Sequence, residues 1–319
     1  MDRRTTIHRK SLISTSINAI LVPMKSMENV EELRRRLMDI ERDFCNTREI
    51  ENDPVSLILK FIDPGDREIV AFLTAVFSYG NVKQIQKSLE TIFLFLGPHP
   101  AKTIQASTGS HWKRQIPRQF RHRFNGADDL GLLLTWLGEA LRQSGSLKNF
   151  FYVGLRENKE MGEILEDFIQ RLTSLPGEPF KKPKSKGALF FLPRPSGGSA
   201  CKRLLLFLRW VSGVGPMDLN LWTDFPRELL LIPVDTHVLR ISKHLGLTKR
   251  KDNSWRTAQE ITEKLKLLDS KDPTRFDFAL CHMGISKQCP SRVDRKICDQ
   301  CGMNSLCVTY NRRRATSLR

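Results

Sequence analysis

The stretch REIVAFLTAVFSYGNVKQIQKSLETIFLFLG, residues 67–97, decides the fold class. Its apolar residues recur three and four positions apart, which is the periodicity of an amphipathic helix. Asp63, Pro64 and Asp66 precede it as helix-start residues, and Gly97 with the proline after it ends it. The same periodicity returns in three further segments, at residues 31–44, 128–143 and 161–175. Alternation with period two is almost absent, so we expect an all-α protein.

Residues 176–200 interrupt this helical pattern. Five prolines and four glycines in this segment predict an irregular, basic loop between two helical parts. We expect a flexible N-terminal extension at residues 1–30 and a first helical region at 31–175, followed by this loop at 176–200. A second helical region at 201–288, a four-cysteine loop at 289–308 and a basic tail at 309–319 complete the expected organisation. No apolar run is long enough to cross a bilayer, so we expect no membrane contact.

The charge balance favours a polyanionic partner. The chain carries 52 Lys+Arg against 35 Asp+Glu, a formal net charge of +17, and each phosphate that such a surface neutralises releases condensed counterions. Residues 180–210 carry eight Lys/Arg and no Asp or Glu, and residues 111–124 carry five Lys/Arg interleaved with Trp112, Phe120 and Phe124. These clusters predict nucleic-acid binding, with a generically basic, well-solvated surface as the alternative.

Four of the seven cysteines have the spacing of a metal centre. Cys289, Cys298, Cys301 and Cys307 form the pattern C-x8-C-x2-C-x5-C. Four thiolates so placed are able to wrap either zinc or a [4Fe–4S] cluster. Cys281 is an alternative to Cys289 as a ligand and is otherwise a buried helical thiol. Because disulfide frameworks spread their cysteines along the chain, this crowding favours a reducing, cytoplasmic location.

Residues 211–222, VSGVGPMDLNLW, place Gly213, Val214 and Gly215 between two apolar stretches. This is the form of a helix-hairpin-helix turn, in which glycines permit a tight reversal and leave backbone amides free to meet a DNA phosphate. The alternative is packing alone, since G-x-G joins many helix pairs.

A second candidate phosphate site lies just before the preceding helix. Ser199 is a good N-cap, and Lys202 and Arg203 fall in the first turn after it. A helix start of this composition suits an anion. A cap with solvated charges is the alternative.

Residues 231–240, LIPVDTHVLR, combine a helix cap with a candidate catalytic acid. Asp235 is a good N-cap for the helix that follows, and its carboxylate is also the best candidate for acid chemistry in the chain. His237 is expected to pack rather than to ligate a metal, because no second ligand stands at a suitable spacing. Arg240 is expected to pair with an acid or to reach a phosphate.

Taken in order, the G-V-G turn, VDTHVLR and the cysteine cluster resemble the endonuclease III and adenine-glycosylase branch of the helix-hairpin-helix DNA glycosylases. The resemblance implies a two-lobed helical fold, binding to double-stranded DNA, and base removal supported by Asp235. It also implies a [4Fe–4S] cluster on the four cysteines. Tyr79 and Asn81 fall on the DNA-facing turn of that family, where a wedge into the base stack and a plain exposed turn are both open.

The chain also departs from that family. Bifunctional members carry a Schiff-base lysine just after the hairpin, where this chain has Met217, and a thioether forms no imine. We therefore expect a monomeric, monofunctional N-glycosylase without lyase activity, or a non-catalytic DNA- or RNA-binding protein on the same scaffold. Lys202, one helix earlier, is the alternative candidate for the role of that Schiff-base lysine. The blocks SACKRLLLFLRW and PVDTHVLR resemble still more closely an uncharacterised bacterial family.

Overall fold

The computed structural model describes residues 27–44, 53–157, 160–180, 187–215, 217–286 and 288–317. Helices make up most of these residues, which confirms the all-α prediction. Within them the strands are β1 (Arg121–His122) and β2 (Asn125–Gly126), which pair as one antiparallel hairpin. No helix in the described ranges is long and apolar enough to span a membrane.

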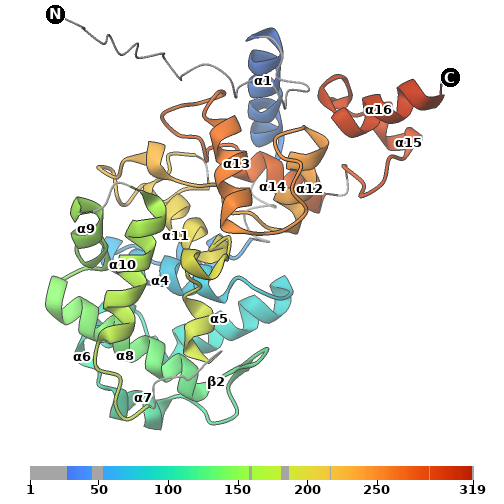
Figure 1. Cartoon of the computed structure of the whole chain (residues 1–319). Coiled ribbons are helices and arrows are strands. Elements are labelled where there is room, and N and C mark those ends of the chain that lie inside the picture. Colours follow the sequence, from blue (N-terminus) through green and yellow to red (C-terminus); the bar gives the residue numbers. More distant parts are fainter. Residues whose placement is uncertain are drawn as a thin grey trace, which may run out of the picture.

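The helices fall into two groups, each around its own hydrophobic cluster (Figure 1). The first lobe contains α3 (Val55–Ile58), α4 (Pro64–Phe77), α5 (Val82–Leu96), α6 (Pro100–Ala106), α7 (Gly109–Gln115), α8 (Ala127–Ser144), α9 (Leu147–Glu157), α10 (Met161–Ser174), η1 (Ala188–Phe191), η2 (Pro195–Gly197), α11 (Lys202–Ser212) and η3 (Arg227–Leu229). The second lobe contains α1 (Met27–Phe44), α12 (Thr236–His244), α13 (Trp255–Leu265), α14 (Asp277–Ile285), α15 (Arg295–Cys298), η4 (Asn304–Leu306) and α16 (Val308–Ser317).

The stretch that decided the fold class forms the centre of the first lobe. It folds as two helices, α4 and α5, because the turn between them ends in Asn81, whose side chain caps α5 by accepting from the Gln84 amide at 2.8 Å. Asp63 caps α4 in the same way, accepting from the Asp66 amide. Nearly every residue of α4 is buried, so this helix is the core element against which α11 packs.

The first helix of the chain joins the second lobe. Leu33 and Leu37 of α1 are buried in the second cluster, and α1 packs on α14 (Figure 1). The helix begins at Met27, four residues before the predicted start, and residues 1–26 of the predicted extension lie outside the described residues. The predicted basic tail is also helical through Ser317, as α16.

The helix expected directly after the Gly213–Gly215 turn is absent, so that part of the hairpin prediction is wrong. Residues 217–226 are extended or turn-like, and the next α-helix is α12. The amides of Leu219 and Leu221 donate back to carbonyls of α11 at 2.7 Å. Trp222 is then buried in the first lobe, where its indole N–H donates to Glu68 at 2.8 Å. Anchoring this indole in the core holds the segment extended.

Candidate functional site

A cavity of about 370 Å³ lies between the two lobes. The first lobe lines it with Asp53 and Pro54 before α3 and with residues of α5 and α11, and the second lobe with residues of α12 and α14. Its apolar surface includes Leu206, Trp210 and Phe278. Its polar side chains are four carboxyls, two cations, a thiol and two imidazoles: Asp53, Asp218, Asp235, Asp277, Lys202, Arg209, Cys281, His237 and His282. An apolar cavity with a few converging polar groups is the usual form of a ligand site.

Asp235 is fixed on the wall of this cavity by its role as the cap of α12. Its Oδ1 accepts from the amides of His237 and Val238, both at 2.8 Å. Its Oδ2 takes part in neither of these bonds and lies 3.8 Å from the Lys202 ammonium and 3.8 Å from the Cys281 thiol. The side chain is 20% exposed. One carboxylate oxygen therefore orients the group while the other faces the cavity.

Lys202 is brought to Asp235 by the arrangement of the two lobes. It is the first residue of α11 in the first lobe, whereas Asp235 precedes α12 in the second. Met217, which stands where the resemblance would place a lysine, lines the same cavity. The structure thus places one amine beside the candidate acid, and that amine comes from a different element.

Asp277 is a second carboxyl in the cavity, and sequence reasoning missed it. It lies in the first turn of α14, one helical turn before Cys281, so both side chains share a face of that helix. Within the described part of the chain its carboxyl makes no hydrogen bond or ion pair. Burial, reinforced by the nearby Asp235 charge and opposed by Arg209, raises the pKa of Asp277 to about 7. The available signal was the spacing of Asp277 and Cys281, four residues apart in the mostly apolar DFALCHMGI.

Asp53 contributes a third carboxyl from the opposite lobe. Its Oδ1 accepts from the amide of Val55 at 2.9 Å. Burial raises its pKa, although the nearby His282 and Lys202 oppose that shift. The pKa values of Asp53 and Asp277 are therefore both raised, with burial as the main cause in each case.

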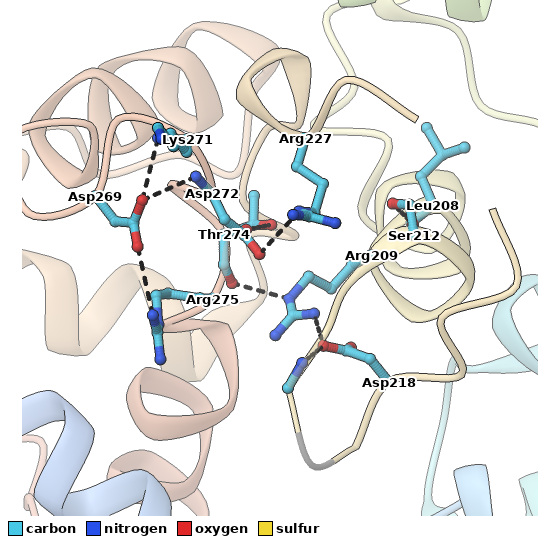
Figure 2. Close-up of polar contacts among 11 residues, drawn as sticks. Leu208, Arg209, Ser212, Asp218, Arg227, Asp269, Lys271, Asp272, Thr274 and Arg275 are labelled. Carbon is cyan, nitrogen blue, oxygen red and sulfur yellow. Dashed lines mark hydrogen bonds and ion pairs between the residues drawn. The ribbon is translucent and has the colours of Figure 1, made fainter. Parts of the chain in front are cut away.

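The remaining wall is closed by a buried ion pair (Figure 2). Arg209 contacts Asp218 through Nη1 and donates through Nε to the carbonyl of Thr274 at 3.0 Å. The side chains of Arg209 and Asp218 are 5% and 2% exposed. Arg227 extends the network to Asp272, which accepts from the Thr274 hydroxyl at 3.1 Å. Since Thr274 and Asp272 precede α14, this network ties the lobes together beside the cavity.

Within the Gly213–Gly215 turn, the amides of both glycines are already bonded inside the fold and are not free for a phosphate. The Gly213 amide donates to the carbonyl of Arg209 at 2.8 Å, and the Gly215 amide donates to the Asp218 carboxylate at 2.5 Å. A carboxylate therefore occupies the position that an incoming phosphate oxygen needs. A Cβ on Gly213 would overlap Arg209 and Asp218, so this glycine is required for close packing. Val214 alone is exposed, at 59%.

The other predicted phosphate-binding residues are mostly held within the fold. Arg203 is buried, stacks on the rings of Tyr79 and Phe190, and donates to the carbonyls of Val76 and Phe190, so its prediction as a phosphate ligand is wrong. Ser199 accepts from the Cys201 amide at 3.1 Å. The cap of α11, which we expected to be Ser199, is instead Cys201, whose φ is 49°.

Tyr79, Asn81 and Arg240 also have internal partners. The Tyr79 hydroxyl donates to Asn125 at 2.6 Å, and burial raises its pKa well above its ordinary value. This hydrogen bond holds the ring in place, which leaves it no freedom to act as a mobile wedge. Asn81 is exposed at the cap of α5. Arg240 donates to the Gly284 carbonyl at 2.9 Å and so joins α12 to α14.

The four predicted ligand cysteines converge on one small cavity of about 30 Å³ behind α12. Apolar residues of α12 and α14, including Ile241 and Met283, line it with them. Two amides point at the thiols, from Met303 to Cys301 and from Tyr310 to Cys307, both at 3.4 Å. As the described residues stand, no group of three His, Cys, Asp or Glu side chains is close enough to hold a metal ion, so any fit to a metal rests on the type of donor and not on the distances between the thiols. Cys281 lies in the cavity with Asp235, so it is not a substitute for Cys289.

Four thiols on a shared apolar cavity, with amides directed at two of the sulfurs, are the type of donor that iron–sulfur clusters and zinc both take. None of the four forms a disulfide. The loop that carries them packs against α12, the helix that Asp235 caps.

Comparison with known proteins gives a family for the chain. No curated protein and no solved structure matches it. The family model described as "Protein of unknown function (DUF2400)" matches residues 53–286. That range contains every residue of the cavity between the lobes and ends before the cysteine loop. The chain belongs to the DUF2400 family.

Proposed function

We propose that this protein binds nucleic acid and cleaves an N-glycosidic bond in the cavity between its lobes. The observation that carries the proposal is the geometry of Asp235. One carboxylate oxygen is fixed by two amides, and the other faces a cavity of about 370 Å³ that is lined on both sides by apolar and aromatic residues. A base flipped out of a nucleic acid needs a pocket of this kind, with a carboxylate beside the sugar carbon.

The charges in the cavity suit this reaction better than they suit phosphate binding. Four carboxyls and two cations line it, although the whole chain is strongly basic. Carboxylates repel phosphates but stabilise the positive charge that develops on a sugar as its base departs. We infer that phosphates lie on the basic surface outside the cavity, while the sugar and base enter it.

Asp277 and Asp235 would divide the proton transfers. As the bond between the sugar carbon and the base nitrogen breaks, its electron pair stays on the base, which takes a proton from the Asp277 carboxyl. The Asp235 carboxylate stabilises the electron-deficient sugar carbon. A water then adds to that carbon and gives its proton to Asp235. The products are a free base and a sugar hydroxyl, and the raised pKa of Asp277 suits it to donate a proton.

Lys202 is assigned a positioning role. Its ammonium lies 3.8 Å from Asp235 Oδ2, so it holds the negative charge of the carboxylate toward the cavity. We propose a monofunctional reaction without an imine, because Met217 replaces the lysine expected on the resemblance.

The four cysteines would hold a [4Fe–4S] cluster, with zinc as the alternative. Cys289, Cys298, Cys301 and Cys307 are the proposed ligands. Either group would act structurally, by fixing the loop against α12 and thus keeping the Asp235 cap in place.

Base release tests the proposal. The full-length protein is incubated with duplexes that carry a panel of damaged bases, and the free base is quantified by chromatography. We expect release of at least one base by the wild type and none above background by Asp235→Asn. Borohydride is expected to trap no covalent adduct. Release by the wild type equal to that by Asp235→Asn on every duplex would sink the enzymatic claim.

A second candidate is nucleic-acid binding without chemistry. It is favoured by the exposed basic side chains of residues 113–123 and by the absence of a lysine at position 217. Salt-dependent binding with no base release from any duplex is the result that would select it.

A further inference from the structure

The basic and aromatic stretch at residues 111–124 is sorted by the fold into a buried and an exposed set. Trp112, Phe120 and His122 are buried in the first lobe. The basic side chains and one aromatic are exposed, namely Lys113, Arg114, Arg118, Arg121, Arg123 and Phe124. Thus α7 and the β1–β2 hairpin present cations around a single aromatic ring, which is 52% exposed.

Four of these exposed side chains border an open groove of about 590 Å³. Arg118, Arg121, Phe124 and Lys113 line it. The two acids on its wall are already engaged, because Asp128 pairs with Lys113 at 2.6 Å and Asp129 accepts from the Gly126 amide at 2.9 Å. In the described ranges, Arg114, Arg118 and Arg123 form no ion pair. The groove is therefore positively charged and has donors available.

The hairpin also adjoins the cavity between the lobes. Gly80 lines that cavity, and a Cβ on Gly80 would lie 3.2 Å from Cδ of Arg123. Arg123 therefore lies against the rim of the cavity, next in the chain to Phe124, which lines the groove. The ring of Phe124 packs edge-on against Phe190, with ring centroids 4.4 Å apart, which holds it in place and leaves its outer surface open.

The backbone of the hairpin places Arg123 in a conformation that favours glycine. Its φ is 56°, in the left-handed region, at the first loop position of a two-residue hairpin. An arginine at such a position is strained, and strain of this kind collects where a side chain is needed in one place.

We propose that the groove and the β1–β2 hairpin hold a strand of nucleic acid as it leaves the cavity. Arg118 and Arg123 contact its phosphates, and Phe124 stacks on one of its bases. This inference rests on the proposed function, since it gives the flanking strand a path from the site of Asp235. Phosphates match the unpaired cations, and a base is the partner that an exposed ring among cations recognises.

The test uses the full-length protein and fluorescent single-stranded and duplex oligonucleotides over a salt series. Arg118→Ala/Arg123→Ala removes two cations, so the slope of log affinity against log salt for duplex should fall by about 2. Phe124→Leu keeps the apolar bulk but removes the ring, and single-strand affinity should fall about tenfold. The matched control Lys251→Ala/Arg256→Ala removes two exposed cations near α13, at the opposite end of the molecule (Figure 1), and should leave the slope unchanged.

The outcomes separate this inference from the proposed function. A wild type that shows no salt-dependent binding would contradict both. A wild type that binds, with the Arg118/Arg123 variant keeping its affinity and slope, would overturn the inference alone. If a sulfated polysaccharide competes as well as DNA and Phe124→Leu has no effect, the groove binds polyanions in general and the assignment to nucleic acid is overturned.

Discussion

The two walls of the cavity use the same residue types in opposite ways. On the first-lobe wall, Asp218 accepts from the Gly215 amide and contacts Arg209, and its side chain is 2% exposed. On the second-lobe wall, Asp235 also accepts from backbone amides but keeps Oδ2 directed at the cavity. Asp218 therefore serves only to stabilise the fold, whereas the fold orients Asp235 toward the cavity.

This difference teaches how a motif that suggests binding loses its donors. The glycine turn looked suited to phosphates because glycines expose amides, yet Asp218, three residues later, takes up the Gly215 amide. LIPVDTHVLR looked like a cap with a possible second role. There the cap uses only Oδ1 of Asp235, and Oδ2 faces the cavity. Backbone amides are available to a ligand only where no side chain nearby satisfies them first.

The largest expected effect concerns what lies behind the second-lobe wall. Alanine at Cys289, Cys298, Cys301 or Cys307 should abolish the visible absorption of the anaerobically purified protein, because each would supply one of the four ligands of the proposed cluster. Cys281→Ala is the matched control, since that thiol faces Asp235 instead, and should leave the colour intact. A wild-type protein that is colourless and contains stoichiometric zinc would show that the four cysteines bind zinc and not an iron–sulfur cluster.

Next in size is the closed wall. Arg209→Met leaves the Asp218 carboxylate buried without its partner, and we expect a loss of about 3–5 kcal/mol in the free energy of unfolding. Adding Asp218→Leu should recover much of that loss, because no buried charge then remains. Urea denaturation of the two variants checks this. Equal stability of Arg209→Met and wild type would show that the buried ion pair does not stabilise the fold.

The pH dependence of Asp277 sharpens the contrast between the walls. Its pKa is raised from 3.8 to about 7, so the folded state holds a proton over that range that the unfolded state releases. The cost of the ionised carboxyl is absent below the lower value and fully present above the upper one. Relative to wild type, Asp277→Asn should therefore gain stability as pH rises through this window. Thermal unfolding at several pH values measures it, and a constant difference would contradict the assignment.

The smallest expected stability effect is at Asp235. Asparagine is also a good N-cap, so Asp235→Asn should change the unfolding free energy little, while Asp235→Ala should cost about 1 kcal/mol. Circular dichroism during denaturation compares them. A large loss in Asp235→Asn would show that the charge serves the fold, as it does at Asp218.

Much of the fold was predictable because helical periodicity is a local signal. The segment 63–97 contains two helices, α4 and α5, together with the residues that cap them. The extended path after Gly215 was not predictable, because it depends on Trp222 reaching Glu68, 154 positions earlier in the chain. The place of α1 in the second lobe depends likewise on distant packing against α14.

The candidate site was predictable only where one residue carried the signal. Asp235 and the four cysteines stood out by spacing, and each group converges on its own cavity. Asp277, Asp53 and the placement of Lys202 depend on which helices meet between the lobes. Arg203 had the charge of a phosphate ligand, but its neighbours Tyr79 and Phe190 come from other segments and bury it.

The most direct test of the central claim is the single-turnover rate of base release by Asp235→Asn, measured beside Cys281→Ala, on the best duplex substrate of the wild type. Both residues line the same cavity, and Sγ of Cys281 lies 3.8 Å from Oδ2 of Asp235. The account predicts a loss of at least about 100-fold for Asp235→Asn and a rate near that of wild type for Cys281→Ala. A wild-type rate in Asp235→Asn would contradict it.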